Sequence, residues 1–198
     1  MTPWRPHADA VRVLASWPAP DPEQALLRLQ FLEYLARRAD GVERSASEGH
    51  LTASCLVVDH TGMRCLLTLH GAVGRWLQTG GHIESIDDTL RAAAAREAIE
   101  ETGIPDLVLT AEPVQLDRHP VRCGGRELDH LDVQYAAVAS AVARVIVSAE
   151  SDALAWFDFD DLPPDADTAV RSLVARVRAL GLVDCSGFGG RGVGDVLG

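Results

Sequence analysis

Three glutamates lie close together near the middle of the chain, in the stretch that begins at Arg96 and ends at Gly103. On a helix, Glu97, Glu100 and Glu101 occupy positions i, i+3 and i+4 and therefore share one face. Such a face is usually just solvated, but carboxylates at this spacing also suit Mg²⁺ or Mn²⁺, which take oxygen ligands and leave positions for a substrate phosphate. Arg96 can brace a glutamate through charge-assisted hydrogen bonds. The triplet therefore predicts a divalent-metal site.

A pair of glycines, Gly80 and Gly81, precedes the glutamates and adds backbone atoms to the expected site. Glycine lets the backbone approach an ion or a phosphate closely, and the Gly81 carbonyl can complete a metal shell. The residues from His82 to Asp87 then form a loop that leads into the carboxylate helix. We therefore expect Gly80, Gly81 and His82 to contact the substrate, with Gly81 also serving as a metal ligand.

The helix that carries the glutamates is expected over residues 88–102. Asp87 or Asp88 can cap its first turn, because a short acidic side chain accepts hydrogen bonds from the exposed amides there. Gly103 is expected to end the helix at the C′ position, where the backbone turns left-handed. The glutamates would then lie in the last two turns of a well-defined helix.

Short apolar runs on both sides of this helix predict strands, because they alternate or are bounded by turn residues. The first two strands form a hairpin around the turn signal His60-Thr61-Gly62. We expect strands over 51–58, 64–69, about 107–117, 131–144 and 154–158, and a last helix over about 165–180. Strands before and after one central helix indicate an α/β (α+β) sandwich.

The two ends of the chain differ from its centre. Residues 5–16 and 21–40 look helical and rich in apolar side chains, and we interpret them as a helical lid or as a dimerisation arm that could form a homodimer. The glycine-rich end is expected to be mobile. The chain is therefore divided into an N-terminal helical extension (1–47), a catalytic domain (48–180) and a flexible tail (181–198).

Composition excludes several classes of function. The 198 residues are 47% apolar, which is enough for one full core. The formal net charge of −11 disfavours non-specific binding of nucleic acids, although metal ions would still let an acidic site accept a phosphate. The chain contains no lysine, so all 18 basic residues are arginines. Schiff-base catalysis and a P-loop, which both need lysine, are excluded.

The same sequence indicates a cytoplasmic protein that does not bind membranes. Apolar runs stay shorter than a membrane span, and the start of the chain lacks the pattern of a secretory signal. The four cysteines show neither C-x-x-C pairs nor zinc-finger spacing, so we expect reduced thiols.

The segment from Gly81 to Ile104 resembles the Nudix box, G-x5-E-x7-R-E-U-x-E-E-x-G-U, in which U is a bulky apolar residue. The core from Arg96 to Gly103 carries the R-E-x-x-E-E-x-G pattern, and residues 80–84 resemble the family's usual G-G-H-[VI]-E entry. With glycines at the right distance and an arginine directly before the glutamates, a catalytic face becomes the favoured interpretation over a solvated one.

This resemblance implies a Nudix fold, an α/β/α sandwich around a mixed sheet. It implies Mg²⁺ or Mn²⁺ held by Glu97, Glu100, Glu101 and the Gly81 carbonyl, with Arg96 orienting a glutamate. The implied reaction is cleavage of a diphosphate linkage in a nucleoside diphosphate derivative or a related small molecule, by attack of a metal-activated water on phosphorus.

The box departs from the family pattern mainly in the loop before the helix. Asp87 replaces its first glutamate, and one extra residue lies between Asp87 and Arg96. Thr79 replaces the usual proline before the glycines, and Ala98 replaces the bulky residue after Arg-Glu. The altered loop keeps open a second interpretation, a catalytically weak Nudix-fold protein that binds or senses a ligand.

Several other side chains are candidates with simpler alternatives. His130, Asp132 and Gln134 alternate with apolar residues, so this strand either lines the substrate cavity, with Asp132 as a substrate contact, or is an ordinary half-exposed strand. Glu150 is a candidate for a distant catalytic base, although a plain surface glutamate is the simpler interpretation. Trp76 either lines the pocket or packs.

A basic stretch around Gly124-Gly125 looks like a loop, and loops often carry binding residues. It could meet a substrate phosphate, although a solvated loop is the simpler interpretation. Its basic residues are Arg118, His119, Arg122 and Arg126.

Overall fold

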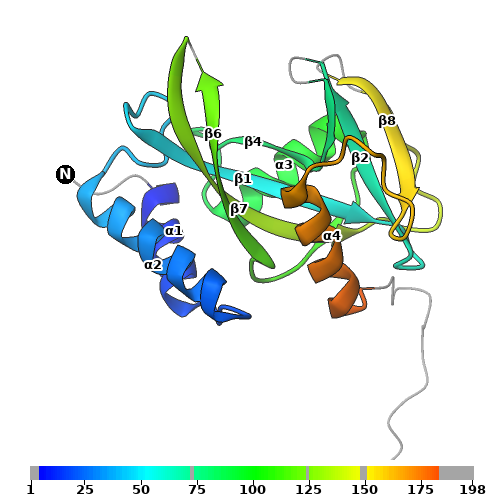
Figure 1. Cartoon of the computed structure of the whole chain (residues 1–198), viewed down its shortest axis with the longest axis horizontal. Coiled ribbons are helices and arrows are strands. Elements are labelled where there is room, and N and C mark those ends of the chain that lie inside the picture. Colours follow the sequence, from blue (N-terminus) through cyan, green and yellow to red (C-terminus); the bar gives the residue numbers. More distant parts are fainter. Residues whose placement is uncertain (1–4, 72–73, 124, 148–150, 183–198) are drawn as a thin grey trace, which may run out of the picture.

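The computed structural model describes residues 5–71, 74–123, 125–147 and 151–182, arranged as Figure 1 shows. The helices are α1 (Arg5–Ser16), α2 (Pro22–Arg37), α3 (Leu90–Thr102) and α4 (Thr168–Leu180). The strands are β1 (Gly49–Val58), β2 (Arg64–His70), β3 (Arg75–Leu77), β4 (Thr79–His82), β5 (Val108–Leu109), β6 (Gln115–Cys123), β7 (Arg126–Val138) and β8 (Ser151–Asp158). Within these ranges no helix is long and apolar enough to cross a membrane. Nearly all of the expected tail lies outside the described residues.

The strands β1 and β7 run parallel at the centre of one mixed sheet, with His50 opposite His130. On its other edge β1 pairs with β4 near its start, where Thr52 lies opposite His82, and with β2 near its end. Strand β7 likewise pairs first with β6 and then with β5. Because two partners diverge from the same edge of each central strand, the sheet curls. This mixed, curled sheet confirms the expected fold class.

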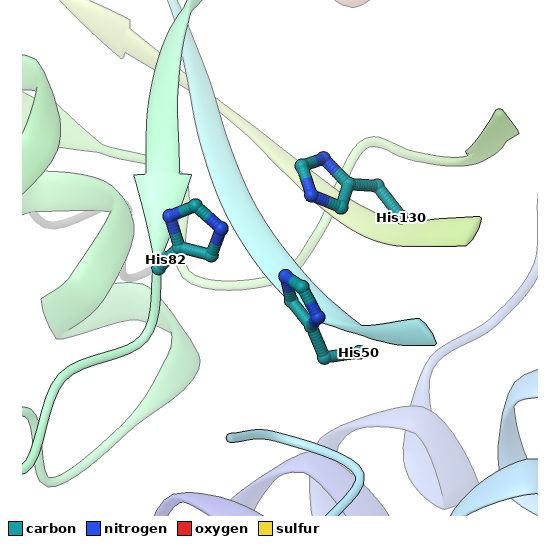
Figure 2. A group of neighbouring side chains, drawn as sticks. All are labelled: His50, His82 and His130. Carbon is teal, nitrogen blue, oxygen red and sulfur yellow. The ribbon is translucent and has the colours of Figure 1, made fainter. Parts of the chain in front are cut away.

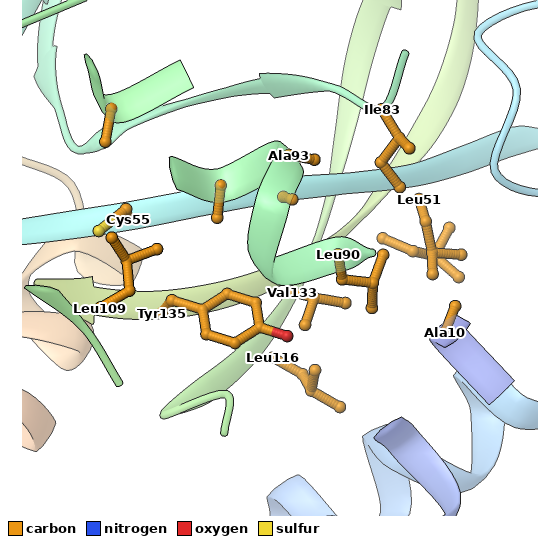
Figure 3. Close-up of a cluster of buried hydrophobic side chains, with 14 of the residues drawn as sticks. Ala10, Leu51, Cys55, Ile83, Leu90, Ala93, Leu109, Leu116, Val133 and Tyr135 are labelled. Atoms are coloured by element: carbon orange, nitrogen blue, oxygen red, sulfur yellow. The ribbon is translucent and has the colours of Figure 1, made fainter. Parts of the chain in front are cut away.

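Helices cover both faces of the sheet, and the alternation of side chains along β1 decides which face each residue meets. Leu51 and Cys55 pack with buried residues of α1, α2 and α3, as Figure 3 shows in part. Leu56 and Val58 pack instead with α4. Figure 1 accordingly shows α3 and α4 on opposite sides of β1. These layers are the α/β/α sandwich expected from the sequence.

The N-cap of helix α3 lies one residue after the acidic pair that we expected to cap it. Thr89 is the N-cap, and its hydroxyl accepts a hydrogen bond from the amide of Ala92 at 3.0 Å. The prediction of Asp87 or Asp88 as the cap is wrong, because the Asp87 carboxylate is held by an arginine described below. Gly103 ends the helix in the left-handed conformation with φ 69°, which confirms the predicted C-terminal stop.

The N-terminal helices pack against the sheet, and the buried side chains of Leu14 and Phe31 belong to the same core as β1. The buried Gln24 side chain in α2 hydrogen-bonds the backbone of Leu116 in β6, donating to its carbonyl at 3.0 Å and accepting from its amide at 2.7 Å. In this structure α1 and α2, which we expected to form a lid or an arm, therefore pack as part of the hydrophobic core. Formation of a homodimer stays a prediction.

The basic stretch that looked like a loop forms most of a hairpin between β6 and β7. The two strands pair antiparallel from Gln115–Gln134 to Cys123–Arg126, and Gly125 turns between them with φ 80°. The interpretation of residues 118–126 as a loop is therefore wrong. Polar and basic side chains along both strands hid the strand pattern, while pairing between the strands supplies the backbone hydrogen bonds that stabilise them.

Candidate functional site

Arg96 is the centre of the carboxylate site. Its Nη1 donates to Glu97 at 2.9 Å and to Glu100 at 3.0 Å, and its Nη2 donates to the backbone carbonyl of His82 at 2.9 Å. The Arg96 side chain is only 14% exposed, so its bonds to Glu97 and to the His82 carbonyl are largely shielded from water, whereas Glu100 is on the solvent side. The contact expected between Arg96 and Glu100 is present. One guanidinium thus holds two box glutamates at the end of β4.

Asp87 contributes the remaining partner of this guanidinium. Its two carboxylate oxygens accept from Nε and Nη2 of Arg96 at 3.1 and 3.0 Å, the planar bidentate arrangement that favours arginine over lysine. One oxygen also accepts from the backbone amide of Glu84 at 2.8 Å. Asp87, which replaces the first glutamate of the box, therefore connects the loop before α3 to Arg96. Asp87 is itself buried.

Gly81 and Glu97 touch directly. A methyl group built on Gly81 would lie 2.6 Å from the carboxyl carbon of Glu97, so only glycine leaves room for this carboxylate against the strand. Burial raises the pKa of Glu97, an effect that its neighbour Arg96 opposes without cancelling. Glu97 thus places a partly buried carboxylate, a possible metal ligand, against the backbone of β4.

Gly80 and Glu101 form the second contact between β4 and α3. The amide of Gly80 donates to Oε1 of Glu101 at 2.9 Å. On the opposite face of β4, a methyl group on Gly80 would lie 2.4 Å from Cβ of Ser54 in the neighbouring strand. The glycine pair therefore brings the strand close to β1 and to two of the glutamates, Glu97 and Glu101, while Glu100 is held next to Glu97 by Arg96.

The NUDIX domain family model matches residues 49–177, a span that contains the whole carboxylate site. The chain belongs to the NUDIX domain family. This membership supports the enzyme class inferred from the box, a pyrophosphohydrolase acting on phosphorus-containing anhydrides. No curated protein matches the chain.

Solved NUDIX structures share the fold with this chain. A NUDIX-family hydrolase from Clostridium perfringens is 23% identical, with a TM-score of 0.56, and the match covers 66% of this chain and 97% of the relative. MutT NUDIX hydrolase from Burkholderia pseudomallei is 25% identical, with a TM-score of 0.51, over 66% and 99% of the two chains. The NUDIX domain of Shewanella oneidensis NrtR, in complex with ADP ribose, is 21% identical, with a TM-score of 0.55, over 75% and 96%.

In this NUDIX chain, Asp132 lies in a buried polar network on the sheet face opposite α3. Its carboxylate accepts from the hydroxyl of Thr52 at 3.0 Å, the hydroxyl of Ser54 at 2.6 Å and the amide of Gln134 at 2.9 Å. Asp132 is 3% exposed, and burial raises its pKa. In the structure, the carboxylate of Asp132, a candidate substrate contact, is thus surrounded by hydrogen-bond donors of the protein itself.

The network continues from β7 to helix α4. Gln115 donates to the side-chain oxygen of Gln134 at 3.0 Å, and the Ser172 hydroxyl donates to Gln115 at 3.2 Å. These bonds connect α4 to the two central strands through polar groups. Alternation along β7 correctly groups His130, Asp132 and Gln134 on one face, but that face is largely buried rather than half exposed.

Three histidines continue this polar face towards the start of β1. The rings of His50 and His130 have centroids 4.8 Å apart, and that of His82 lies 5.0 Å from His50 and 5.5 Å from His130. Burial lowers the pKa of His82 to about 4 and of His130 to about 3, and it lowers that of His50. The rings are therefore neutral near pH 7. The sequence did not predict this cluster, because alternation assigns each histidine to a face of its own strand but does not show which strands pair.

The remaining candidates are placed as follows. Trp76 packs edge-on against Phe157 at 4.9 Å between ring centroids. Arg118 donates to Asp129 across the hairpin, and His119 Nδ1 lies 2.6 Å from a carboxylate oxygen of Asp117. Glu150, the candidate for a distant base, lies outside the described residues.

Proposed function

We propose that this chain is a Mg²⁺- or Mn²⁺-dependent hydrolase that cleaves a diphosphate linkage in a nucleoside diphosphate derivative or a related small molecule. The observation that supports this best is the pairing of Glu97 and Glu100 on Arg96, with Glu97 seated against Gly81. The pairing lies within the NUDIX domain, and structures that share this fold include an Ap4A hydrolase from C. elegans and the dihydroneopterin triphosphate pyrophosphohydrolase of E. coli.

The residues present fit a hard divalent cation. Glu97, Glu100 and Glu101 offer carboxylate oxygens, and the absence of a side chain at Gly81 leaves the backbone accessible beside Glu97. Glu100 is 59% exposed, so the ligand set opens towards solvent and a phosphate can reach it. When bound, the ion would neutralise phosphate charge and activate the attacking water.

The chain's own residues then have distinct roles. Arg96 keeps Glu97 and Glu100 together while Asp87 fixes the guanidinium, so the carboxylates are oriented before the substrate arrives. Glu101 accepts from the amide of Gly80 and thereby fixes the distance between β4 and α3. A box glutamate is the proposed proton acceptor for the attacking water.

A substrate panel tests the proposal. Nucleoside triphosphates, sugar nucleotides, ADP-ribose, dinucleoside polyphosphates and coenzyme A are each incubated with the full chain and Mg²⁺ or Mn²⁺, and released phosphate or monophosphate is measured. Isotopically labelled water should place its oxygen on a phosphate product, because the attack is on phosphorus. Absence of metal binding in a titration would reject the proposal.

A second candidate function is ligand binding without turnover. Asp87, which replaces the glutamate of the box, favours it, and the Shewanella NrtR domain was solved with ADP ribose bound. This candidate predicts metal binding and a calorimetric signal with one of the panel compounds, but no product from any of them.

A further inference from the structure

His50, His82 and His130 come from three neighbouring strands, β1, β4 and β7, and their rings point towards one another (Figure 2). The register explains why they meet. His50 lies opposite His130 on the parallel partner, and His82 lies opposite Thr52, two positions along β1 from His50. Residues two apart share a face of the sheet, so all three rings project to the same side.

Their nitrogen atoms are close enough to share one ion. One ring nitrogen from each histidine lies within 4.8 Å of those of the other two. Nitrogen ligands of a tetrahedral zinc ion are bound at about 2.0–2.1 Å, which puts them about 3.4 Å apart. The nitrogens therefore have to approach one another by about 1.4 Å or less to reach bonding range.

The rings also lack the partners that buried imidazoles usually have. His50 is fully buried, yet neither of its ring nitrogens has a hydrogen-bond partner in the described part of the chain. Nε2 of His82 and Nε2 of His130 are buried and unpartnered in the same way. Buried polar atoms are nearly always satisfied in folded proteins, so three neighbouring rings that each carry an unpartnered nitrogen point to a shared ligand.

We propose that His50, His82 and His130 form a second metal site, which binds a transition-metal ion of the Zn²⁺ type. Three imidazoles and an open fourth position suit such an ion, whereas Mg²⁺ prefers oxygen ligands. The ion would be separate from the one proposed at the glutamates, because alternation along β4 directs the His82 ring away from the face where Gly81 meets Glu97. It would link three neighbouring strands and hold the end of β4, the strand that carries the glycine pair.

Co²⁺ serves as the probe, because its visible absorption distinguishes tetrahedral from octahedral sites. The full chain is treated with a chelator and supplied with excess Mg²⁺ to fill oxygen sites, and Co²⁺ is then added and displaced with Zn²⁺. We expect one equivalent of tetrahedral Co²⁺ that Zn²⁺ displaces. His82→Gln and His130→Gln should weaken binding by about 100-fold or more, since even the hydrogen-bond partners of metal ligands contribute about 10- to 100-fold.

His60→Gln is the matched control, because His60 is exposed in the turn between β1 and β2. It should bind Co²⁺ as the unchanged chain does, and Glu100→Gln should too, since the glutamates belong to the other site. Circular dichroism shows whether each variant folds. If neither histidine variant folds, X-ray absorption of the zinc-loaded unchanged chain decides, because imidazole ligands give characteristic multiple scattering.

Two results would overturn the proposal. One is octahedral or absent Co²⁺ absorption in the unchanged chain. The other is equal affinity in folded His82→Gln, His130→Gln and His60→Gln. Because every readout is metal binding and none is catalysis, failure here would leave the proposed hydrolase activity standing, and an inactive chain that binds one Co²⁺ would reject only the hydrolase.

Discussion

Arg96 donates from Nη2 to the backbone carbonyl of His82 at 2.9 Å, while the ring of His82 faces His50 and His130. His82 is thus part of both groups. Its backbone carbonyl binds the arginine of the carboxylate site, and its ring belongs to the histidine cluster. The two groups are therefore structurally coupled, because a shift of the Arg96 guanidinium would move the His82 backbone at the end of β4.

Arg96→Lys should lower turnover by about tenfold or more, because a single ammonium cannot reproduce the bidentate and forked hydrogen bonds of the guanidinium. The affected contacts are those to Asp87, Glu97 and Glu100. Steady-state kinetics with the substrate found in the panel measures the loss. Arg91→Lys on the same helix should keep normal turnover, because the Arg91 side chain hydrogen-bonds the backbone carbonyls of Leu109 and Thr110 and no glutamate of the site. Equal rates for the two variants would contradict the role given to Arg96.

Glu100→Gln and Glu101→Gln should each lower turnover by about 100-fold or more while the fold survives. A neutral amide keeps the size of the side chain but removes the charge that binds a hard cation. Metal titration alongside the kinetics should show weaker Mg²⁺ or Mn²⁺ binding. Glu112→Gln, at an exposed turn, is the control for loss of one negative charge. Unchanged rates in both site variants would reject the proposed site.

Gly81→Ala should displace the Glu97 carboxylate, because the new methyl group would lie 2.6 Å from its carboxyl carbon. We expect weaker metal binding and a stability loss of about 1–3 kcal/mol, as is typical of overpacking. Gly71→Ala is the control, since the atoms nearest to its methyl group would be those at the end of the flexible Asp152 side chain, the first at 3.3 Å. Urea unfolding and metal titration of the two variants give the comparison, and normal metal binding by Gly81→Ala would show that the contact is dispensable.

The sequence predicted the carboxylate helix well because its signals are local. Gly103 can end the helix by its own conformational freedom, and Arg96 reaches Glu100 within one turn. The start of the helix was predicted less well, because Asp87, Asp88 and Thr89 are all acceptable caps. A tertiary contact decides among them. Arg96 hydrogen-bonds the Asp87 carboxylate, and Thr89 caps the helix instead.

The histidine cluster could not be predicted because it depends on pairing between distant strands. His50 and His130 meet only when β1 and β7 run parallel in one particular register. A shift of one residue would put one of the rings on the opposite face of the sheet. The packing of α1 and α2 could not be predicted for the same reason. The apolar content of a helix indicates that it is buried but does not show which element it packs against.

Asp9→Asn should lower the free energy of unfolding by about 1–2 kcal/mol, because a charged acceptor at a helix N-terminus is lost. In the structure, Oδ2 of Asp9 accepts from the amide of Leu90 at 2.9 Å, at the first turn of α3. Urea unfolding measures the change. Asp88→Asn should change stability by less than about 0.5 kcal/mol, because its pairing with Arg5 is exposed on both sides. Equal stability of the two variants would mean that α1 does not support α3 through this bond.

Asp21→Asn should make stability less dependent on acidic pH. Asp21 caps α2 by accepting from the amide of Gln24 and pairs with Arg176 of α4 at 2.5 Å. The bond from the Gln24 amide, followed by the bond from Arg176, lowers the pKa of Asp21 below its ordinary value of 3.8. Its stabilising effect is therefore fully present above pH 3.8 and is lost as the pH falls through the lower pKa of the folded chain.

The melting temperatures of the unchanged chain and Asp21→Asn, followed from pH 7 down to pH 2.5, give the measurement. Above the ordinary aspartate pKa the unchanged chain should melt higher, because asparagine can still cap the helix but cannot attract Arg176 by charge. The two curves should converge at the acidic end. Asp160→Asn, which loses the exposed pair between Asp160 and Arg178, shows how much of any effect comes from a surface ion pair alone. A gap that stays constant or widens on acidification would contradict the assignment, because only a carboxylate with a lowered pKa loses its contribution in that direction.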